Sequence, residues 1–152
     1  MKKKIKILTI HKDKWSFTKF RKKIFLVLEK KIHKRITNIT LFNKERYSEF
    51  NLKESIKVLK GIDYKKFDLI FIYGVRQILI YQIYCKIYRI KNNNFFFLTG
   101  LGYLFTERGE LIQFLFFKIL QFLFRNNDKI IVQNFIDYKI FKKKFPKNKI
   151  YI

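Results

Sequence analysis

The chain is 152 residues long, which suits one domain with a hydrophobic core of its own. Its formal net charge of +24 comes with 49% hydrophobic and 19% aromatic residues, far too much apolar material for a disordered basic tail. The positive field favours anionic partners such as phospholipid headgroups, prenyl pyrophosphates, nucleotide sugars or nucleic acid, and charge alone does not choose among them. Part of the charge reflects composition, because Lys, Ile, Phe and Asn are abundant and alanine is absent, as AT-rich coding sequences produce.

Secretion signals and membrane-spanning segments are not expected. Cys85 is the only cysteine, which excludes an internal disulfide and a cysteine zinc cluster and fits a reducing cytoplasm. The basic amino terminus is followed only by a short apolar run at residues 5–10, so the apolar core of a signal peptide is missing. The two most apolar stretches, residues 78–90 and 111–124, are shorter than the ~18 residues of a spanning helix or carry charged side chains. We therefore expect a cytoplasmic protein.

Strands and helices are predicted to alternate along the chain. Residues 5–10 are rich in β-branched side chains and predict the first strand, and apolar residues recurring at helical spacing from Phe17 to Ile32 predict an amphipathic helix. The alternation continues with strands at residues 36–42, 68–73, 95–98 and 129–132 and with helices at residues 52–59, 78–90, 111–124 and 135–145. This order predicts an α/β domain with a Rossmann-like parallel sheet, helices on both faces, and functional loops at the carboxyl ends of the strands.

The sequence stops within a predicted element. Pro146 closes the last helix, and residues 149–152 begin what reads as another strand. We therefore expect a truncated protein or a fragment.

Common catalytic motifs are absent, since the sequence contains no GxGxxG, P-loop or HExxH pattern. His11 and His33 do not form a recognised metal-ligand pattern with acidic or cysteine residues, so neither a metal site nor a bound cofactor is expected. His33 lies in a Lys-rich helix end, which is typical of the surface. His11 follows the first strand, where loops face a ligand cleft, and Gln133 and Asn134 follow a later strand. These three residues are predicted to line one cleft.

A glycine-containing segment follows the strand at residues 95–98. It includes Thr99, Gly100, Gly102 and Tyr103, and it holds two of the five glycines in the chain. Glycine permits positive φ and lets a ligand approach the bare backbone, so the segment is a candidate binding loop. The plainer alternative is a tight turn from strand to helix.

The same segment resembles a loop of a known enzyme family. Residues 99–105 are similar to the "TGLGYvF" loop in the amino-terminal domain of family 4 glycosyltransferases, which extend lipid-linked and capsular glycans. Three other segments agree with this family in order and spacing: WSFTKFR at residues 15–21 with its W-x-F-x-x-H-R, YGVRQ at residues 73–77 with its Y-T-x-K-P, and VQNFIDYKIF at residues 132–141 with its FQN-x-x-D…F.

The resemblance implies half of a two-domain GT-B fold, with residues 1–152 forming the amino-terminal domain that binds a lipid-linked glycan acceptor. A carboxy-terminal domain, absent here, would hold the nucleotide sugar, from which a hexose or N-acetylhexosamine is transferred in polysaccharide or lipid-linked oligosaccharide synthesis. This half alone is expected to be inactive unless a separate donor-binding chain completes it. Phe20 replaces the His of the family pattern and Gln77 replaces its Pro, so the catalytic residue is unknown.

Side-chain chemistry suggests how an acceptor would be bound. Arg21 and Arg76 carry guanidinium groups that match the oxygens of a pyrophosphate, although each also reads as a solvated surface residue. Trp15 offers a ring that stacks on a sugar face, with a core position as the alternative. The backbone amides of the glycine loop and Tyr103 would contact the acceptor sugar.

The predicted helix at residues 111–124 is coated with Phe and Leu, apart from a narrow polar stripe that includes Lys118 and Gln121. An aromatic face beside cations fits docking on an anionic membrane surface, so a peripheral position on the inner face of the cell membrane is expected. Burial against a partner domain is the alternative for this helix.

Two other functions stay open. A basic nucleic-acid-binding module is supported only by charge and interleaved aromatic residues, and the lysines are spread over every predicted element, so nucleic acid is not the expected partner. An inactive truncated remnant is the second alternative, because the donor half is missing and Phe20 departs from the family pattern.

Overall fold

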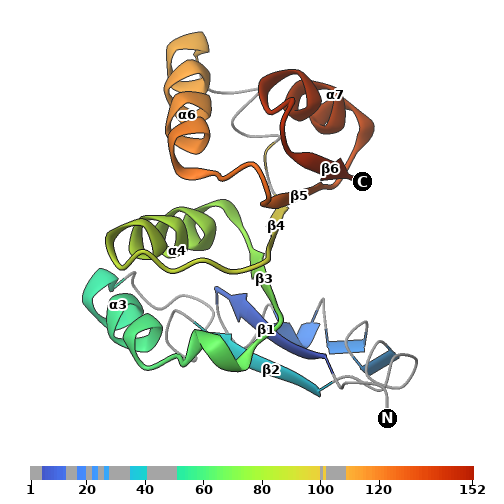
Figure 1. Ribbon diagram of the computed structural model, residues 1–152. Helices are drawn as coiled ribbons and strands as arrows, with labels where there is room; N and C mark the ends of the chain where they lie inside the picture. The colour runs from blue at the N-terminus through green and yellow to red at the C-terminus, as the bar shows by residue number, and fades with distance from the viewer. Residues whose placement is uncertain are drawn as a thin grey trace.

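The computed structural model describes residues 5–12, 17–19, 22–23, 26–27, 51–99, 101 and 109–152, together with the backbone of residues 35–40. In this part of the chain six strands form one sheet in the spatial order β2-β1-β3-β4-β5-β6, and every neighbouring pair is parallel (Figure 1). The strands are β1 (Lys6–His11), β2 (Arg35–Thr40), β3 (Leu69–Tyr73), β4 (Asn94–Leu98), β5 (Lys129–Val132) and β6 (Lys149–Tyr151). The predicted α/β fold is confirmed.

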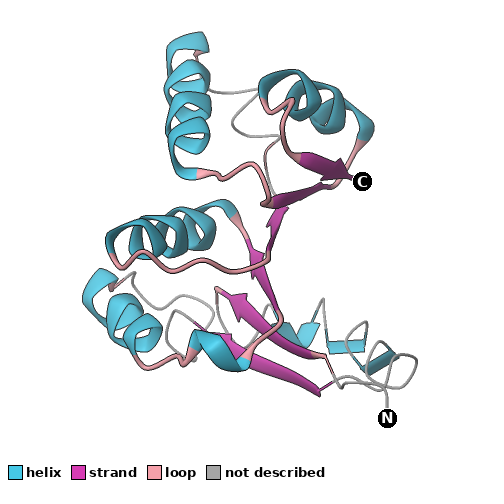
Figure 2. Cartoon of the chain, in the orientation of Figure 1, coloured by secondary structure: helices cyan, strands magenta, loops and turns pink. Residues whose placement is uncertain are grey.

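Helices cover both faces of the sheet, as predicted. The helices with continuous bounds are α3 (Leu52–Lys60), α4 (Val75–Ile87), α6 (Glu110–Leu123) and α7 (Phe135–Lys144), and a 3-10 turn spans Tyr64–Lys66. Figure 1 shows α3, α4 and α6 along one side of the sheet, with the helical segments at residues 17–19, 22–23 and 26–27 on the other. The alternation of helix and strand runs through the described chain (Figure 2).

The core lies between the sheet and the helices on one of its faces. Burial alternates along β3 and β4, where Ile70, Ile72, Phe96 and Leu98 are fully buried and the residues between them are half-buried. This period of two places one apolar row of each strand under the helices. Aromatic rings complete the core around α6, as in the contact of Phe117 with Phe141 of α7, whose centroids lie 5.4 Å apart.

The ends of α4 differ from the sequence-based expectation. The helix begins at Val75 rather than at residue 78, because Gly74 acts as its N-cap and the first turn contains a polar pair that the apolar pattern did not include. It stops at Ile87 rather than at residue 90, since Arg89 adopts a left-handed conformation with φ of 53°. The end of the predicted strand at residues 36–42 lies outside the described residues.

A buried polar network joins the amino ends of β4 and β5. The carboxylate of Asp128, which is fully buried, accepts hydrogen bonds from the side chains of Gln82 (2.7 Å) and Asn94 (2.9 Å) and from the backbone N–H of Arg125 (2.8 Å). Asn94 in turn accepts a hydrogen bond from the Tyr81 hydroxyl at 3.0 Å. Burial raises the pKa of Asp128, and the three donors oppose that shift by stabilising the carboxylate. The network therefore anchors α4 to the sheet.

Candidate functional site

The strand order places a topological switch point between β1 and β3. These two strands are hydrogen-bonded neighbours, while β2, which lies between them in sequence, is on the far side of β1. The connections leaving β1 and β3 therefore diverge to opposite faces of the sheet, and the carboxyl ends of the strands at such a point are where open α/β sheets bind ligands. The candidate site is this edge of the sheet.

His11 is the last residue of β1 and lies at the switch point. Its side chain is fully buried, and its Nε2 is 2.9 Å from the Oγ1 of Thr9. The imidazole stacks on the ring of Tyr73 at the end of β3, with centroids 4.8 Å apart, and Tyr73 stacks on Phe97 of β4 at 4.2 Å. The ring of Phe17 also packs against the imidazole, with the two ring centroids 4.7 Å apart and the planes tilted by 55°. These rings restrict the orientation of His11 at the carboxyl edge of the sheet.

The turn from β3 to α4 contributes the positive charge of the site. Gly74 has φ of 92°, and its N–H donates a hydrogen bond to the carbonyl oxygen of Phe97 at 2.9 Å, which fixes the turn against β4. The first turn of α4 contains no acidic residue, and Arg76 within it is exposed. The amide dipoles of a helix give its amino terminus a partial positive charge, so backbone and guanidinium here favour the same anionic ligand.

The remaining described candidates follow β4 and β5 at the same edge. Thr99 is half-buried directly after β4, and Gln133 is exposed directly after β5. The Asn134 side chain caps α7: its Oδ1 accepts a hydrogen bond from the N–H of Asp137 at 2.8 Å, and its Nδ2 donates to the Asp137 carboxylate at 2.9 Å. Asn134 therefore fixes the start of α7 at this edge of the sheet.

The other candidates, Trp15, Arg21, Gly100, Gly102 and Tyr103, lie outside the described residues. The structure thus brings five of the predicted site residues to one edge of the sheet, at the ends of four neighbouring strands: His11, Arg76, Thr99, Gln133 and Asn134.

Covalent and metal chemistry find little support among the described residues. Cys85 is buried in α4, and burial raises the pKa of its thiol to about 11, so it is protonated and unreactive at neutral pH. No group of three His, Cys, Asp or Glu side chains in the described ranges is arranged to hold a metal ion.

A cavity lies at the opposite edge of the sheet. Its lining residues come from the amino ends of β1, β3, β4 and β5, and its volume is about 550 Å³. The strand topology favours the carboxyl edge for the site described above, because only there do the connections diverge. The amino-edge cavity is a separate feature.

Two features of this molecule were not singled out from the sequence. Gly74 appeared only inside a family motif, although an isolated glycine between a strand and a helix is a signal for a turn with positive φ. The network around Asp128 has no local signal, since its partners are distant in sequence.

Comparison of the chain with protein-family models, with curated proteins and with solved structures gave no match. In the described part of the chain, no helix has the length and the unbroken apolar character needed to cross a membrane.

Proposed function

We propose that this chain is the acceptor-binding half of a glycosyltransferase, and that it holds the pyrophosphate of a lipid-linked glycan at the carboxyl edge of its sheet. The observation that carries the proposal is the switch point between β1 and β3, at which Arg76 and the amino terminus of α4 supply positive charge. The sequence resemblance supports the proposal independently, because residues 73–77 and 99–105 are similar to segments of the acceptor-binding domain of such enzymes.

The catalytic step would need a second half. In this proposal a donor-binding domain or a separate chain supplies the nucleotide sugar, and the present chain positions the acceptor. The rings of Phe17 and Tyr73 pack against His11, and its side chain has no exposed surface, so in this proposal it supports the site from beneath and does not contact the acceptor as an acid or base.

Replacing Arg76 by glutamine is expected to weaken binding of geranyl pyrophosphate by about tenfold or more. The guanidinium would make charge-assisted hydrogen bonds to the pyrophosphate, and such bonds contribute about 1.5–3 kcal/mol each. Isothermal titration calorimetry measures the dissociation constants. Because Arg76 is exposed, the variant should fold as the unmodified protein does.

Arg89→Gln is the matched control, since Arg89 is an exposed arginine just beyond the other end of α4. It removes the same charge from the protein without touching the carboxyl edge, so it should leave the affinity nearly unchanged. Equal losses for the two variants would show that only net charge matters, and the proposed site would be wrong.

We further propose that the exposed face of α6 docks on an anionic membrane, where a lipid-linked acceptor would be found. Phe114 and Phe122 are 53% and 71% exposed on this helix. The Nζ of Lys118 lies 5.4 Å from the ring centroid of Phe114. The Nζ of Lys86, on α4, lies 3.1 Å from the ring centroid of Phe122. In a peripheral membrane helix, apolar rings enter the headgroup region of the bilayer. Neighbouring lysines pair with the anionic lipids.

The double variant Phe114→Ser/Phe122→Ser is expected to reduce binding to phosphatidylglycerol vesicles by about tenfold or more, because each exposed ring contributes apolar surface to the membrane. Co-sedimentation measures the bound fraction. Leu52→Ser, which alters an exposed apolar residue of α3, is the control and should bind normally.

Undiminished binding by the Phe114→Ser/Phe122→Ser variant would contradict membrane docking through α6. Binding to random oligonucleotide without binding to these vesicles would favour the nucleic-acid alternative instead.

A further inference from the structure

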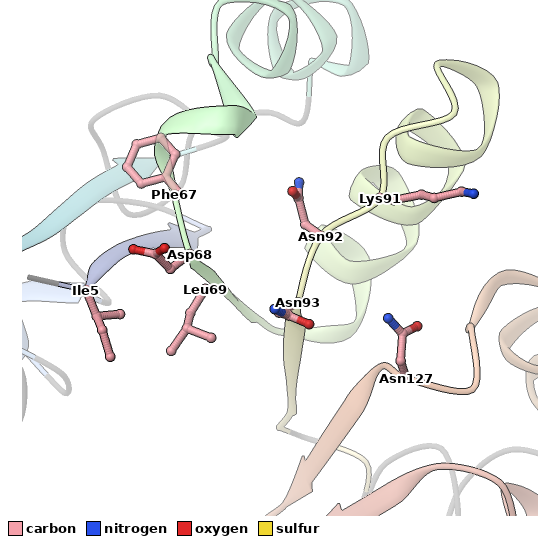
Figure 3. Close-up of a pocket in the computed structure, with 8 residues that line it drawn as sticks. All are labelled: Ile5, Phe67, Asp68, Leu69, Lys91, Asn92, Asn93 and Asn127. Carbon is pink, nitrogen blue, oxygen red and sulfur yellow. The ribbon is translucent and has the colours of Figure 1, made fainter. Parts of the chain in front are cut away.

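The cavity at the amino edge of the sheet is lined on opposite sides by different chemistry. Figure 3 shows Phe67 and Asp68 on one side, where the 3-10 turn leads into β3, and Asn92 and Asn93 on the other, ahead of β4. Asn127 extends the second side from the loop before β5. At about 550 Å³, the cavity is within the ~300–1,000 Å³ range typical of small-molecule sites.

The charges in this cavity balance, which is unusual for this chain. Lysine and arginine outnumber aspartate and glutamate by 35 to 11 in the sequence, yet the lining contains one of each sign, Lys91 and Asp68. The electrostatic attraction for an anionic ligand is therefore weaker here than on the rest of the lysine-rich surface. A neutral ligand with many polar groups fits the cavity better.

Carboxamides give the cavity its hydrogen-bonding character. Three asparagines line it, and each carries an NH₂ donor group and a carbonyl acceptor: Asn92, Asn93 and Asn127. Every hydroxyl of a sugar can likewise both donate and accept a hydrogen bond. Asn92 is half-buried in the lining, and its carboxamide adds to this polar side of the cavity. The half-buried ring of Phe67 offers an apolar surface for the face of a sugar ring.

We propose that this amino-edge cavity is a binding site for a neutral sugar. The carboxamides of Asn93 and Asn127 hydrogen-bond the hydroxyl groups, and Phe67 packs against the ring. Asp68 also accepts a hydrogen bond from the backbone N–H of Lys6 at 2.8 Å, so it joins the starts of β1 and β3 as well as lining the site. The inference is independent of the proposed function, because none of these residues lies at the carboxyl edge.

The test is a titration of the ¹⁵N-labelled chain with the methyl glycosides of glucose, mannose and N-acetylglucosamine, followed by nuclear magnetic resonance. The expected result is a saturable shift of the Asn93 and Asn127 side-chain amide signals with at least one glycoside. The double variant Asn93→Ala/Asn127→Ala should weaken that binding by about tenfold or more, since two hydrogen-bonding groups are lost. Both residues are exposed, so the variant should fold normally.

Asn126→Ala is the matched control, because Asn126 is an exposed neighbour of Asn127 that does not line the cavity. It should bind the glycoside as the unmodified chain does. Inorganic phosphate is the comparison ligand and should not shift the Asn93 and Asn127 signals. The proposal is overturned if no glycoside shifts these signals, if phosphate does so instead, or if the double variant binds as tightly as the control.

Discussion

Asp128→Ala is expected to lower the free energy of unfolding by at least about 3 kcal/mol, the largest effect foreseen for this chain. The substitution removes one acceptor group from three donors, on Gln82, Asn94 and Arg125, in a fully buried place. Each buried donor left without an acceptor costs about 1–3 kcal/mol. Urea unfolding, followed by circular dichroism, measures the loss.

Two further variants separate the network from the loss of a negative charge. Asp128→Asn keeps one acceptor oxygen, so its free energy of unfolding should lie between those of the unmodified chain and of Asp128→Ala. Asp63→Ala removes a carboxylate that is 52% exposed and 3.3 Å from Lys66, and an exposed pair of this kind is worth about 0–1 kcal/mol. If Asp63→Ala cost as much as Asp128→Ala, the buried network would not be what stabilises this region.

Gly74→Ala is expected to lower the free energy of unfolding by about 1–3 kcal/mol and to weaken binding of geranyl pyrophosphate. With φ of 92°, position 74 has a backbone conformation that residues with a side chain rarely adopt. A Cβ there would also lie 2.7 Å from the Oε1 of Gln77. Since Gly74 caps α4, relief of this strain would shift the turn that carries Arg76. Urea unfolding and calorimetry measure the two effects.

Gly61→Ala is the matched control for Gly74→Ala. Gly61 ends α3 with φ of −74°, and a Cβ added there would have its nearest neighbour at 3.5 Å, an ordinary contact. Alanine should therefore be neutral or stabilise by about 0.4–1 kcal/mol. The double variant Gly74→Ala/Gln77→Ala removes the clash and keeps the strained φ. Full recovery of stability in that variant would show that the backbone conformation carries no cost.

Most of the fold could be predicted because its helices and strands follow from local patterns of apolar and polar residues. The prediction of a strand at residues 129–132 has the observed bounds, since a run of three β-branched residues, 130–132, stands between polar segments. The start of α4 was placed too late because Gly74, Arg76 and Gln77 interrupt the apolar pattern, although the helix already includes the latter two. The periodicity of apolar residues indicates which side of a helix is buried. The first residue of the helix is set instead by its N-cap, which the apolar pattern does not show.

The candidate site could be predicted less completely. The position of His11 followed from the first strand, because the carboxyl end of a parallel strand faces the ligand side. Its stacking on Tyr73 depends on β1 and β3 being neighbours, which sequence order does not specify. Asn134 carried a readable signal, since asparagine three residues before an aspartate at the start of a helix is typical of a cap.

The most direct test of the proposed function is to locate where geranyl pyrophosphate binds, by nuclear magnetic resonance of the ¹⁵N-labelled chain. We expect the backbone amides of His11, Gly74 and Arg76 to shift in a saturable way, while those of Asn93 and Asn127 at the amino edge do not. Inorganic pyrophosphate should shift the same carboxyl-edge amides, because the proposed contacts are made to the phosphate oxygens. No shift at the carboxyl edge, or shifts spread evenly over the lysine-rich surface, would contradict an acceptor site at the switch point.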